Sequence, residues 1–498
     1  MIYDCTLLFF YICRYNALPY FGIRVSSIKS WKFQIVTLAV VPVLSHDSET
    51  LKRFVLDVLS QFFKDTRSLL IFDTTDGAAN MLKLSQLLGH KRTTCLAHCL
   101  HNLLTTDTIN KIPKIQSLIT RCKEIVTALH FKTCLLNEEK QTEEDIQLQD
   151  RISDVNEELI LDENNPVLEQ VDESVELETE QEGEQEVDQS ARSLPHIGSS
   201  YKHHVHQTLK LSVPTRWNTN LTMIESLLDL FNPVNNALKK IGKGTMCMDD
   251  EDKDLLEKLR ELLKPFKAFT KLFSENAPNL ALLPLVKSKI KRLCMTDRKD
   301  LEEIASFKKK ILASLDKRLP ETDLMKLSAA FDPGVWSLVM KKEECDELLR
   351  KTFMELQQSR YQENIFGSAS IDENEAAEHS RKPDDTDMDM RSSLIFEAKT
   401  STEQSGSNAL ALFQKELSSY FILSESSQSK PLEFWEMNQT RFPMMSSMAK
   451  IYLGISAGSV PVECMFSSTG LILNGKRSRL TPAHVNMISF IHDNNIYL

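Results

Sequence analysis

Apolar residues in the first third of the chain change their spacing from one segment to the next. Three strand-like runs, at 5–13, 20–26 and 33–42, follow one another closely. From 48 to 63 the apolar positions instead recur every three or four residues, which predicts an amphipathic helix. A fourth apolar run at 69–72 precedes more helical sequence. This order predicts an α/β fold, with a mixed sheet that carries helices on its faces.

Helical spacing dominates the rest of the chain and is interrupted by two polar segments. We divide the chain into a sheet-bearing part at 1–90, a helical domain made of 91–136 and 200–366, an acidic insert at 137–199, a polar linker at 367–407 and a compact helical region at 408–498.

The formal net charge of −11 conceals two parts of opposite sign. Residues 138–190 hold 21 Asp and Glu against two basic residues, a net of −19, so the remainder of the chain carries +8. A segment this acidic, with almost no aromatic residues, is expected to be disordered because it cannot bury a core of its own. The mildly basic remainder is compatible with a polyanionic partner.

Cysteine usage and hydropathy bear on the compartment. The 10 cysteines are scattered without paired spacing, which suits a reducing compartment rather than a disulfide framework. The membrane-like stretch at 6–13 is far shorter than the ~20 apolar residues that a spanning helix needs. It also lacks the basic flank and the cleavage site of a signal peptide. We therefore expect no membrane partner.

An acidic residue, Asp76, follows the fourth apolar run. An Asp placed just after a buried strand presents its carboxylate at the carboxyl edge of the sheet, where ligands of α/β folds usually bind. Small residues at 77–79 leave room for a substrate backbone or a metal ion. The alternative interpretation is that Asp76 only caps the next helix.

Two further motifs each have a structural alternative. Cys95 and His98 are three residues apart, but a tetrahedral zinc site needs four ligands and no matching distal pair is present, so we expect a structural, local contact over one helical turn. Arg216 and Trp217 stand at a helix entry, where the ring can stack on an extruded base while the guanidinium holds a phosphate. In the alternative interpretation the tryptophan anchors the helical domain.

Apolar and aromatic residues crowd the C-terminal region beyond what a small helical unit buries alone, which indicates a partner surface. The residues expected to contribute to dimerisation are Trp435, Phe442, Pro443, Tyr452, Leu453, Pro461, Phe466 and Leu480.

Taken in this order, the motifs resemble the hAT superfamily of DNA transposases and their domesticated, BED-zinc-finger-associated relatives. The resemblance runs from about residue 19 to 495 and is most specific in 408–498. It implies an RNase H-like core that is split by a large all-helical insertion and completed by a C-terminal dimerisation region. It also implies a homodimer or larger assembly, DNA as a candidate partner, and location in the nucleus.

The resemblance also implies a nuclease site, in which two Asp and a distant Glu hold divalent metal for strand cleavage and transfer. It assigns the second Asp to Asp76, the Glu to Glu463 and the base-stacking aromatic to Trp217. The first Asp is missing, because the expected position is Phe10 and Asp4 lies six residues too early.

Two consequences follow for cofactors. Loss of one of three carboxylates should weaken Mg²⁺ or Mn²⁺ binding severely, because these ions need several hard oxygen ligands. The arginine that usually follows the Glu is also replaced, by Cys464. We therefore expect no cofactor and no catalysis from the chain as written, and Mg²⁺ or Mn²⁺ at Asp76 and Glu463 only in a catalytically complete form.

No zinc-finger spacing of the BED type precedes residue 95, so we expect an N-terminus that is truncated or has lost that module. Three functions stay open. The leading one is a transposase-derived, dimerising, DNA-associated nuclear protein without catalysis. The alternatives are an active transposase in a full-length form, and a dimeric interaction protein or transcriptional regulator that does not bind DNA.

Overall fold

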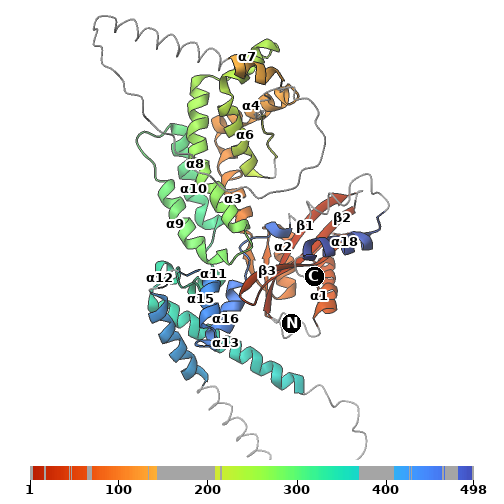
Figure 1. The fold of residues 1–498 in the computed structure, drawn as a ribbon, viewed down its shortest axis with the longest axis vertical. Helices are drawn as coiled ribbons and strands as arrows, with labels where there is room; N and C mark the ends of the chain where they lie inside the picture. The colour runs from red at the N-terminus through yellow and green to blue at the C-terminus, as the bar shows by residue number, and fades with distance from the viewer. Residues whose placement is uncertain are drawn as a thin grey trace, which may run out of the picture. The chain divides into compact units, whose positions relative to one another are not determined.

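The structure, a computed structural model, describes residues 4–15, 18–43, 45, 47–63, 70–132, 134–142, 208–213, 216–368, 409–425, 427, 429–462, 465 and 480–495. Two compact units make up the structure (Figure 1), a first unit of Met1–Gln116 with Glu261–Leu498 and a second unit of Ser117–Arg260. The acidic insert from residue 143 onward, and the polar linker from 369 onward, lie outside the described residues, so the expected disorder of the insert stays a prediction there. Its first residues, 137–142, are instead helical, because they continue a helix that begins at 134 and buries Leu136.

One five-stranded sheet forms in the described part of the first unit. Its strands are β1 (Asp4–Tyr15), β2 (Leu18–Lys29), β3 (Lys32–Pro42), β4 (Leu70–Thr75) and β5 (Lys91–Thr94), in the spatial order β3-β2-β1-β4-β5. The first three strands pair antiparallel, whereas β4 and β5 run parallel to β1. Helix α1 (Ser48–Phe62) connects β3 to β4, and α2 (Ala79–Leu88) connects β4 to β5. The mixed sheet therefore has the strand and helix order that the apolar pattern indicates.

Strand β5 is the part of the sheet that the apolar pattern does not reveal. Its four residues are Lys91, Arg92, Thr93 and Thr94, and only Thr93 is buried. The sheet consequently extends to residue 94, whereas we expected the helical domain to begin at 91. A short polar strand of this kind forms because its backbone completes the ladder of β4, and not because it supplies apolar side chains.

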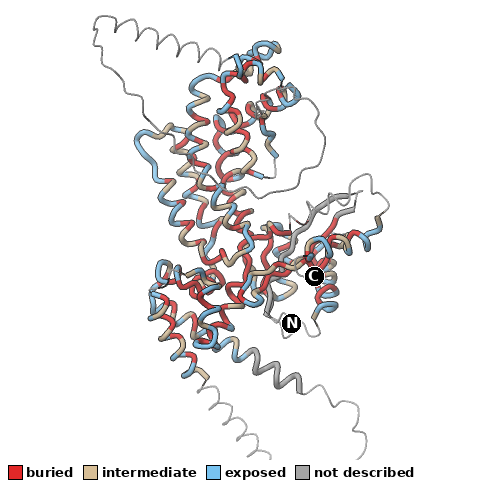
Figure 2. Tube along the Cα trace, viewed as in Figure 1, coloured by how far each residue is buried: buried red, intermediate tan, exposed pale blue. Residues whose placement is uncertain are grey.

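Both faces of the sheet are covered by other elements. Since adjacent strand residues point to opposite sides of a sheet, neighbouring residues of one strand contact different layers. On β2, Phe21 packs with residues of α1 and α2, such as Leu51 and Leu84. The preceding residue, Tyr20, instead packs with C-terminal residues, among them Val485 of α18 (Pro482–Asn494). Figure 2 colours the described residues of these elements by burial, with buried positions interspersed among exposed ones.

Helix α18 also satisfies the edge of β3. The side chain of Asn494 accepts a hydrogen bond from the Thr37 backbone N–H at 2.9 Å and donates one to the Thr37 carbonyl at 2.8 Å. The Asn486 side chain accepts from the Val40 N–H at 2.8 Å. Exposed strand edges promote unwanted pairing, so the end of the chain protects a strand near its beginning.

Helices form most of the remaining structure. In the first unit these are α3 (Leu96–Leu104), α9 (Leu283–Leu293), α10 (Glu302–Arg318), α11 (Asp323–Ala330), α12 (Trp336–Val339), α13 (Lys342–Ser368), the helical residues 409–424, α15 (Pro431–Asn438) and α16 (Pro443–Leu453). Helices α6 (Trp217–Asp229) and α7 (Phe231–Lys240) lie in the second unit, and α4 (Pro113–Leu129) and α8 (Asp250–Ser274) have residues in both units. Short 3-10 turns occur at Ile109–Lys111, Gly244–Met246 and Asn279–Leu282. Of the helices described, none has the length and apolar character needed to cross a bilayer.

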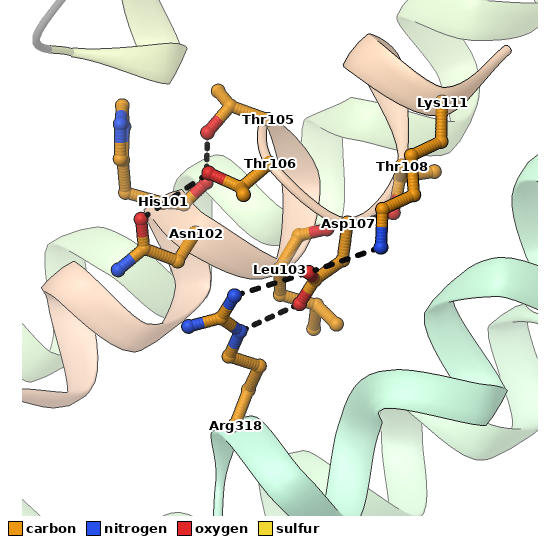
Figure 3. A network of polar contacts seen from close by, with 9 residues as sticks. All are labelled: His101, Asn102, Leu103, Thr105, Thr106, Asp107, Thr108, Lys111 and Arg318. Carbon is orange, nitrogen blue, oxygen red and sulfur yellow. Dashed lines mark hydrogen bonds and ion pairs between the residues drawn. The ribbon is translucent and has the colours of Figure 1, made fainter.

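A polar network fixes the end of α3 to α10 within the first unit (Figure 3). The Arg318 guanidinium donates to both carboxylate oxygens of Asp107, at 2.6 and 3.0 Å. This hydrogen-bonded contact, opposed by partial burial, lowers the pKa of Asp107 below its usual value, and Lys111 contributes a further positive charge. The Thr108 hydroxyl donates to the Leu103 carbonyl at 2.7 Å and closes the turn that follows α3.

Candidate site at the carboxyl ends of the central strands

Asp76 lies directly after β4, at the carboxyl edge of the parallel part of the sheet. Its side chain is half-buried, and Oδ1 accepts a hydrogen bond from the Ala78 N–H at 3.1 Å. Ala78 is the residue that precedes the first turn of α2. Asp76 thus occupies the edge position expected of a ligand-binding carboxylate, and the same carboxylate also supports the start of the next helix.

Arg92 on β5 holds the backbone around Asp76. Its Nη2 donates to the Asp76 carbonyl at 2.6 Å, and its Nε donates to the Thr75 hydroxyl at 2.7 Å. Burial lowers the pKa of Arg92, while Cys99, Asp76 and Asp73 act in the opposite direction. Because a guanidinium keeps its proton at any physiological pH, a fixed positive charge lies beside Asp76. The sequence patterns did not single out Arg92, since it belongs to a strand that they miss.

A second acid of β4, Asp73, is fully buried. Its Oδ1 lies 2.8 Å from His90 Nδ1, and its Oδ2 has no hydrogen-bond partner among the described residues. His90 directly precedes β5, so the pair ties the two parallel strands together. The sequence patterns do not indicate this pair, because His90 comes 17 residues after Asp73.

The C-terminal segment before Glu463 returns to this edge. The Thr74 hydroxyl donates to the Ser456 carbonyl at 2.9 Å, and the Leu96 N–H donates to the Ala457 carbonyl at 2.9 Å. Gly458 is closely surrounded, since a Cβ placed there would lie 2.8 Å from the Phe273 carbonyl oxygen. These contacts bring the chain near residue 460 to the carboxyl ends of β4 and β5.

Cys95 takes part in the same junction. It is fully buried, its N–H donates to the Thr75 carbonyl at 2.8 Å, and its Sγ accepts from the Ser459 N–H at 3.3 Å. His98 is half-buried, with its ring 5.9 Å from that of His101. Burial, followed by the nearby His98, lowers the pKa of His101. Cys95 thus has a backbone partner in the C-terminal segment, and a local contact between Cys95 and His98 stays a prediction.

Glu463 itself, Cys464 and Phe466 lie outside the described residues. The neighbouring residues are described. The Pro461 carbonyl accepts from Arg24 Nη1 at 2.6 Å, and Val462 and Met465 are buried against the sheet. Within the described residues, no group of three or more His, Cys, Asp or Glu side chains could hold a metal ion.

The pairing of β1 with β4 bears on the position at which the resemblance expects the first Asp. Leu7 pairs with Asp73 and Leu8 with Thr74, so the same register, continued along β1, sets Phe10 level with Asp76. Asp4 pairs with Leu70, at the opposite end of β4. Six residues of a parallel strand span about 20 Å, so Asp4 lies far from the carboxyl edge.

The second unit contains the predicted DNA-contacting pair. Arg216 is exposed, and Trp217, the first residue of α6, is 2% exposed. The faces of the indole are therefore covered by protein, and stacking on a base requires the ring to be uncovered first. Burial of this extent is what the anchoring interpretation of Trp217 expects.

Most of the residues expected at a dimer surface instead lie in the core of the first unit. The indole N–H of Trp435 donates to the Phe331 carbonyl at 2.7 Å, and the Tyr452 ring stacks on the Phe331 ring at 5.7 Å. Pro443 is exposed and Leu480 is half-buried, whereas Trp435, Phe442, Tyr452, Leu453 and Pro461 are buried. The apolar residues that indicated a partner surface are therefore buried largely within the chain, against the end of α11 and the sheet. Direct contact of these residues with a second copy stays a prediction.

Comparisons with known proteins agree with this C-terminal architecture. Residues 413–495 match the hAT family C-terminal dimerisation region. The Hobo transposase of Drosophila melanogaster is 32% identical over 120 residues, which cover 24% of this chain and 18% of that protein. Zinc finger BED domain-containing protein 4 of Homo sapiens is 22% identical over 305 residues, which cover 59% of this chain and 24% of that protein. The chain thus spans less than a quarter of the length of either relative, and the region most characteristic of the family lies at its C-terminal end. Residues 413–495 thus carry the hAT family's C-terminal dimerisation region, and the chain is similar to hAT-family, transposase-like proteins.

Proposed function

We propose that this protein is a transposase-derived, dimerising, DNA-associated nuclear protein whose nuclease site is incomplete and inactive. The observation that supports the proposal is the pairing of β1 with β4, which runs from Asp4 with Leu70 to Leu8 with Thr74; continued by two residues, this register would put Phe10 level with Asp76 and leaves Asp4 at the far end of the strand. A phenylalanine supplies no oxygen ligand where a carboxylate is needed.

The architecture supports an RNase H-like core. Three antiparallel strands followed by two parallel strands, with helices between β3, β4 and β5, give the order β3-β2-β1-β4-β5. The helices from α3 to α13 are inserted between β5 and the C-terminal segments that return to the sheet. We therefore propose that this helical part is the insertion and that 408–498 completes the core.

The residues present do not fit a catalytic metal pair. Asp76 Oδ1 already accepts from the Ala78 N–H, and the Arg92 guanidinium is fixed against the Asp76 carbonyl. A cation bound there would face this positive charge with one carboxylate fewer than the family's three. For these reasons no catalytic step is assigned to Asp76 or Glu463 in this chain, and Mg²⁺ or Mn²⁺ belongs only to a complete form.

The burial of Trp217 favours a second candidate, a dimeric interaction protein or transcriptional regulator that does not bind DNA. The two candidates differ in a mobility-shift experiment with duplex DNA at low salt. DNA association predicts a complex that weakens steeply as salt rises and that weakens further in Arg216→Glu. Absence of any complex at low salt would instead establish the second candidate. Imaging of the tagged protein tests nuclear location separately.

Activity is tested by Mn²⁺-dependent nicking and strand transfer on plasmid DNA. We expect the unaltered chain to be indistinguishable from Glu463→Gln, because the site lacks its first acid. Phe10→Asp should raise Mn²⁺ affinity, and Phe10→Asp/Asp76→Asn should abolish that gain. Circular dichroism confirms that each variant is folded. Activity of the unaltered chain that is lost in Glu463→Gln would overturn the proposal in favour of an active transposase.

A further inference from the structure

A pocket of about 640 Å³ opens in the first unit, formed by residues that take no part in the site described above. The turn after β2 contributes Trp31, the start of β3 contributes Phe33, and the start of α15 contributes Pro431. Residues 275–279 and Leu282 form a further wall. Pockets of this size hold a small ligand or a few residues of a peptide.

Asp332 supplies a buried carboxylate to this pocket. It follows α11 and is 6% exposed, and its Oδ1 accepts from the Gly334 N–H at 3.0 Å. No hydrogen bond or ion pair to Oδ2 is present among the described residues. A carboxylate withdrawn from water is unfavourable unless it meets a positive charge or further donors, so this oxygen is suited to an incoming cation. Consistent with this, burial raises the pKa of Asp332 to about 6, with the Gly334 N–H acting in the opposite direction.

The remaining charges of the pocket are also acidic in balance. Glu275, Glu433 and Glu436 line it together with two lysines, Lys32 and Lys430. Lys430 is already in an ion pair with Glu433 at 3.9 Å. Carboxylates therefore outnumber lysines by four to two, which disfavours an anionic ligand and complements a cationic one.

The aromatic wall distinguishes between kinds of cation. Trp31 is held by its indole N–H, which donates to Gln439 Oε1 at 2.9 Å, and Lys450 Nζ lies 4.5 Å from the ring centroid. Because Trp31 is buried and Lys450 lies over its ring, it contributes a fixed apolar edge and not a second cation site, and the half-buried Phe33 extends that apolar wall. Arginine suits such a wall better than lysine, because its planar guanidinium stacks on aromatic and apolar surfaces and is more weakly hydrated.

We propose that this pocket binds the side chain of an arginine presented by a peptide segment of a partner protein. The guanidinium meets Asp332, the aliphatic stem lies along the apolar wall, and the volume leaves room for the neighbouring residues of the segment. Neither DNA binding nor catalysis enters this assignment, so it stands or fails independently of the proposed function.

Titration calorimetry of the full chain tests the assignment. The ligand is an acetylated, amidated five-residue peptide with a central arginine between alanines, and its matched control carries citrulline, which has the same shape without the charge. We expect saturable binding of the arginine peptide, weaker binding of a lysine peptide, and affinity at least about tenfold lower for citrulline. Free arginine should bind more weakly than the peptide, because it lacks the flanking backbone.

Variants localise the binding. Asp332→Asn keeps an oxygen for the Gly334 N–H and should lower affinity about tenfold or more, and Glu436→Gln, at an exposed side chain, should lower it less. Asp254→Asn, an exposed carboxylate of α8, should leave affinity unchanged. Equal binding of the arginine and citrulline peptides, or binding that survives both Asp332→Asn and Glu436→Gln, would overturn the assignment. Binding of inorganic phosphate in place of the arginine peptide would do the same.

Discussion

Two buried carboxylates of the first unit differ in what surrounds them. Asp73 has a histidine within hydrogen-bond distance, whereas Asp332 has a single backbone N–H on one oxygen and an open pocket beside the other. Unpaired buried charge lowers stability, and natural proteins keep it where function requires it. The first carboxylate is therefore expected to serve folding and the second to serve binding.

Replacing Asp332 should increase stability in a pH-dependent way. Its pKa in the folded chain is about 6 and lies above the value of an unfolded aspartate, so the folded state loses stability as pH rises from about 4 to about 6. Asn does not titrate, so Asp332→Asn should gain up to about 3 kcal/mol over the unaltered chain at neutral pH and nothing below about pH 4. Urea denaturation at neutral pH and below about pH 4 measures this difference in the free energy of unfolding. The other charged groups that face Asp332 across the pocket stay the same in both proteins; they are Glu275, Glu433, Glu436, Lys32 and Lys430. An equal difference at both pH values contradicts it.

Replacing His90 should have the opposite effect. His90→Ala leaves the fully buried Asp73 without its histidine partner, so we expect a loss of about 2–4 kcal/mol in the free energy of unfolding. Adding Asp73→Asn should recover part of the loss, because the stranded charge is removed. His130→Ala, at an exposed position after α4, is the control and should change little. Denaturant titration of the unaltered chain, His90→Ala, Asp73→Asn and the double variant gives the coupling, and strictly additive effects would argue against the pair.

The elements that the sequence predicts best are those with apolar runs. Strands β2 and β3 and helix α1 each bury a set of apolar side chains, and the existence and order of β1 to β4 and α1 follow from their apolar runs. Strand β5 has no such run, because its contribution to the sheet comes from backbone hydrogen bonds and from polar contacts of Arg92. Patterns of side chains carry no signal for an element of that kind.

The turn between β2 and β3 is a testable case at the same scale. Ser30 and Trp31 have φ of 48° and 55°, in the left-handed region that L residues with side chains seldom adopt. Trp31 is fixed by its contacts, so the strain is more easily relieved at the exposed Ser30. Ser30→Gly should raise the free energy of unfolding by about 0.5–1 kcal/mol, measured as a shift of the thermal midpoint. The control Lys29→Gly, at the exposed end of β2, should lower the free energy of unfolding. If both glycine variants stabilised the protein, the backbone strain at Ser30 would not be the cause.

On the scale of the whole molecule, the sequence predicts which C-terminal side chains are buried but not which part of the chain buries them. Asn494 forms a hydrogen bond with Thr37, and Ser456 forms one with Thr74, although each pair is hundreds of residues apart in the sequence. The sequence of 408–498 alone does not indicate these partners. The same limit applies to the candidate site. Asp76 follows from the pattern of its own strand, but its alignment with Phe10 depends on the register between two strands.

This distinction leads to opposite outcomes for two kinds of C-terminal substitution. Trp435→Ala removes a fully buried ring and should lower the stability of the subunit itself by about 3–5 kcal/mol. Ile422 and Met437 are 73% and 67% exposed within the dimerisation region, so Ile422→Glu and Met437→Glu should weaken self-association and leave the subunit folded. Met295→Glu, at a position that is 70% exposed outside that region, is the control and should change neither property. Light scattering coupled to size-exclusion chromatography gives the oligomeric state, and near-ultraviolet circular dichroism reports the fold. The opposite result would be a folded monomer from Trp435→Ala together with intact dimers from both glutamate variants. It would show that the aromatic residues form the dimer contact, because only the loss of an interface residue dissociates a dimer without unfolding the subunit.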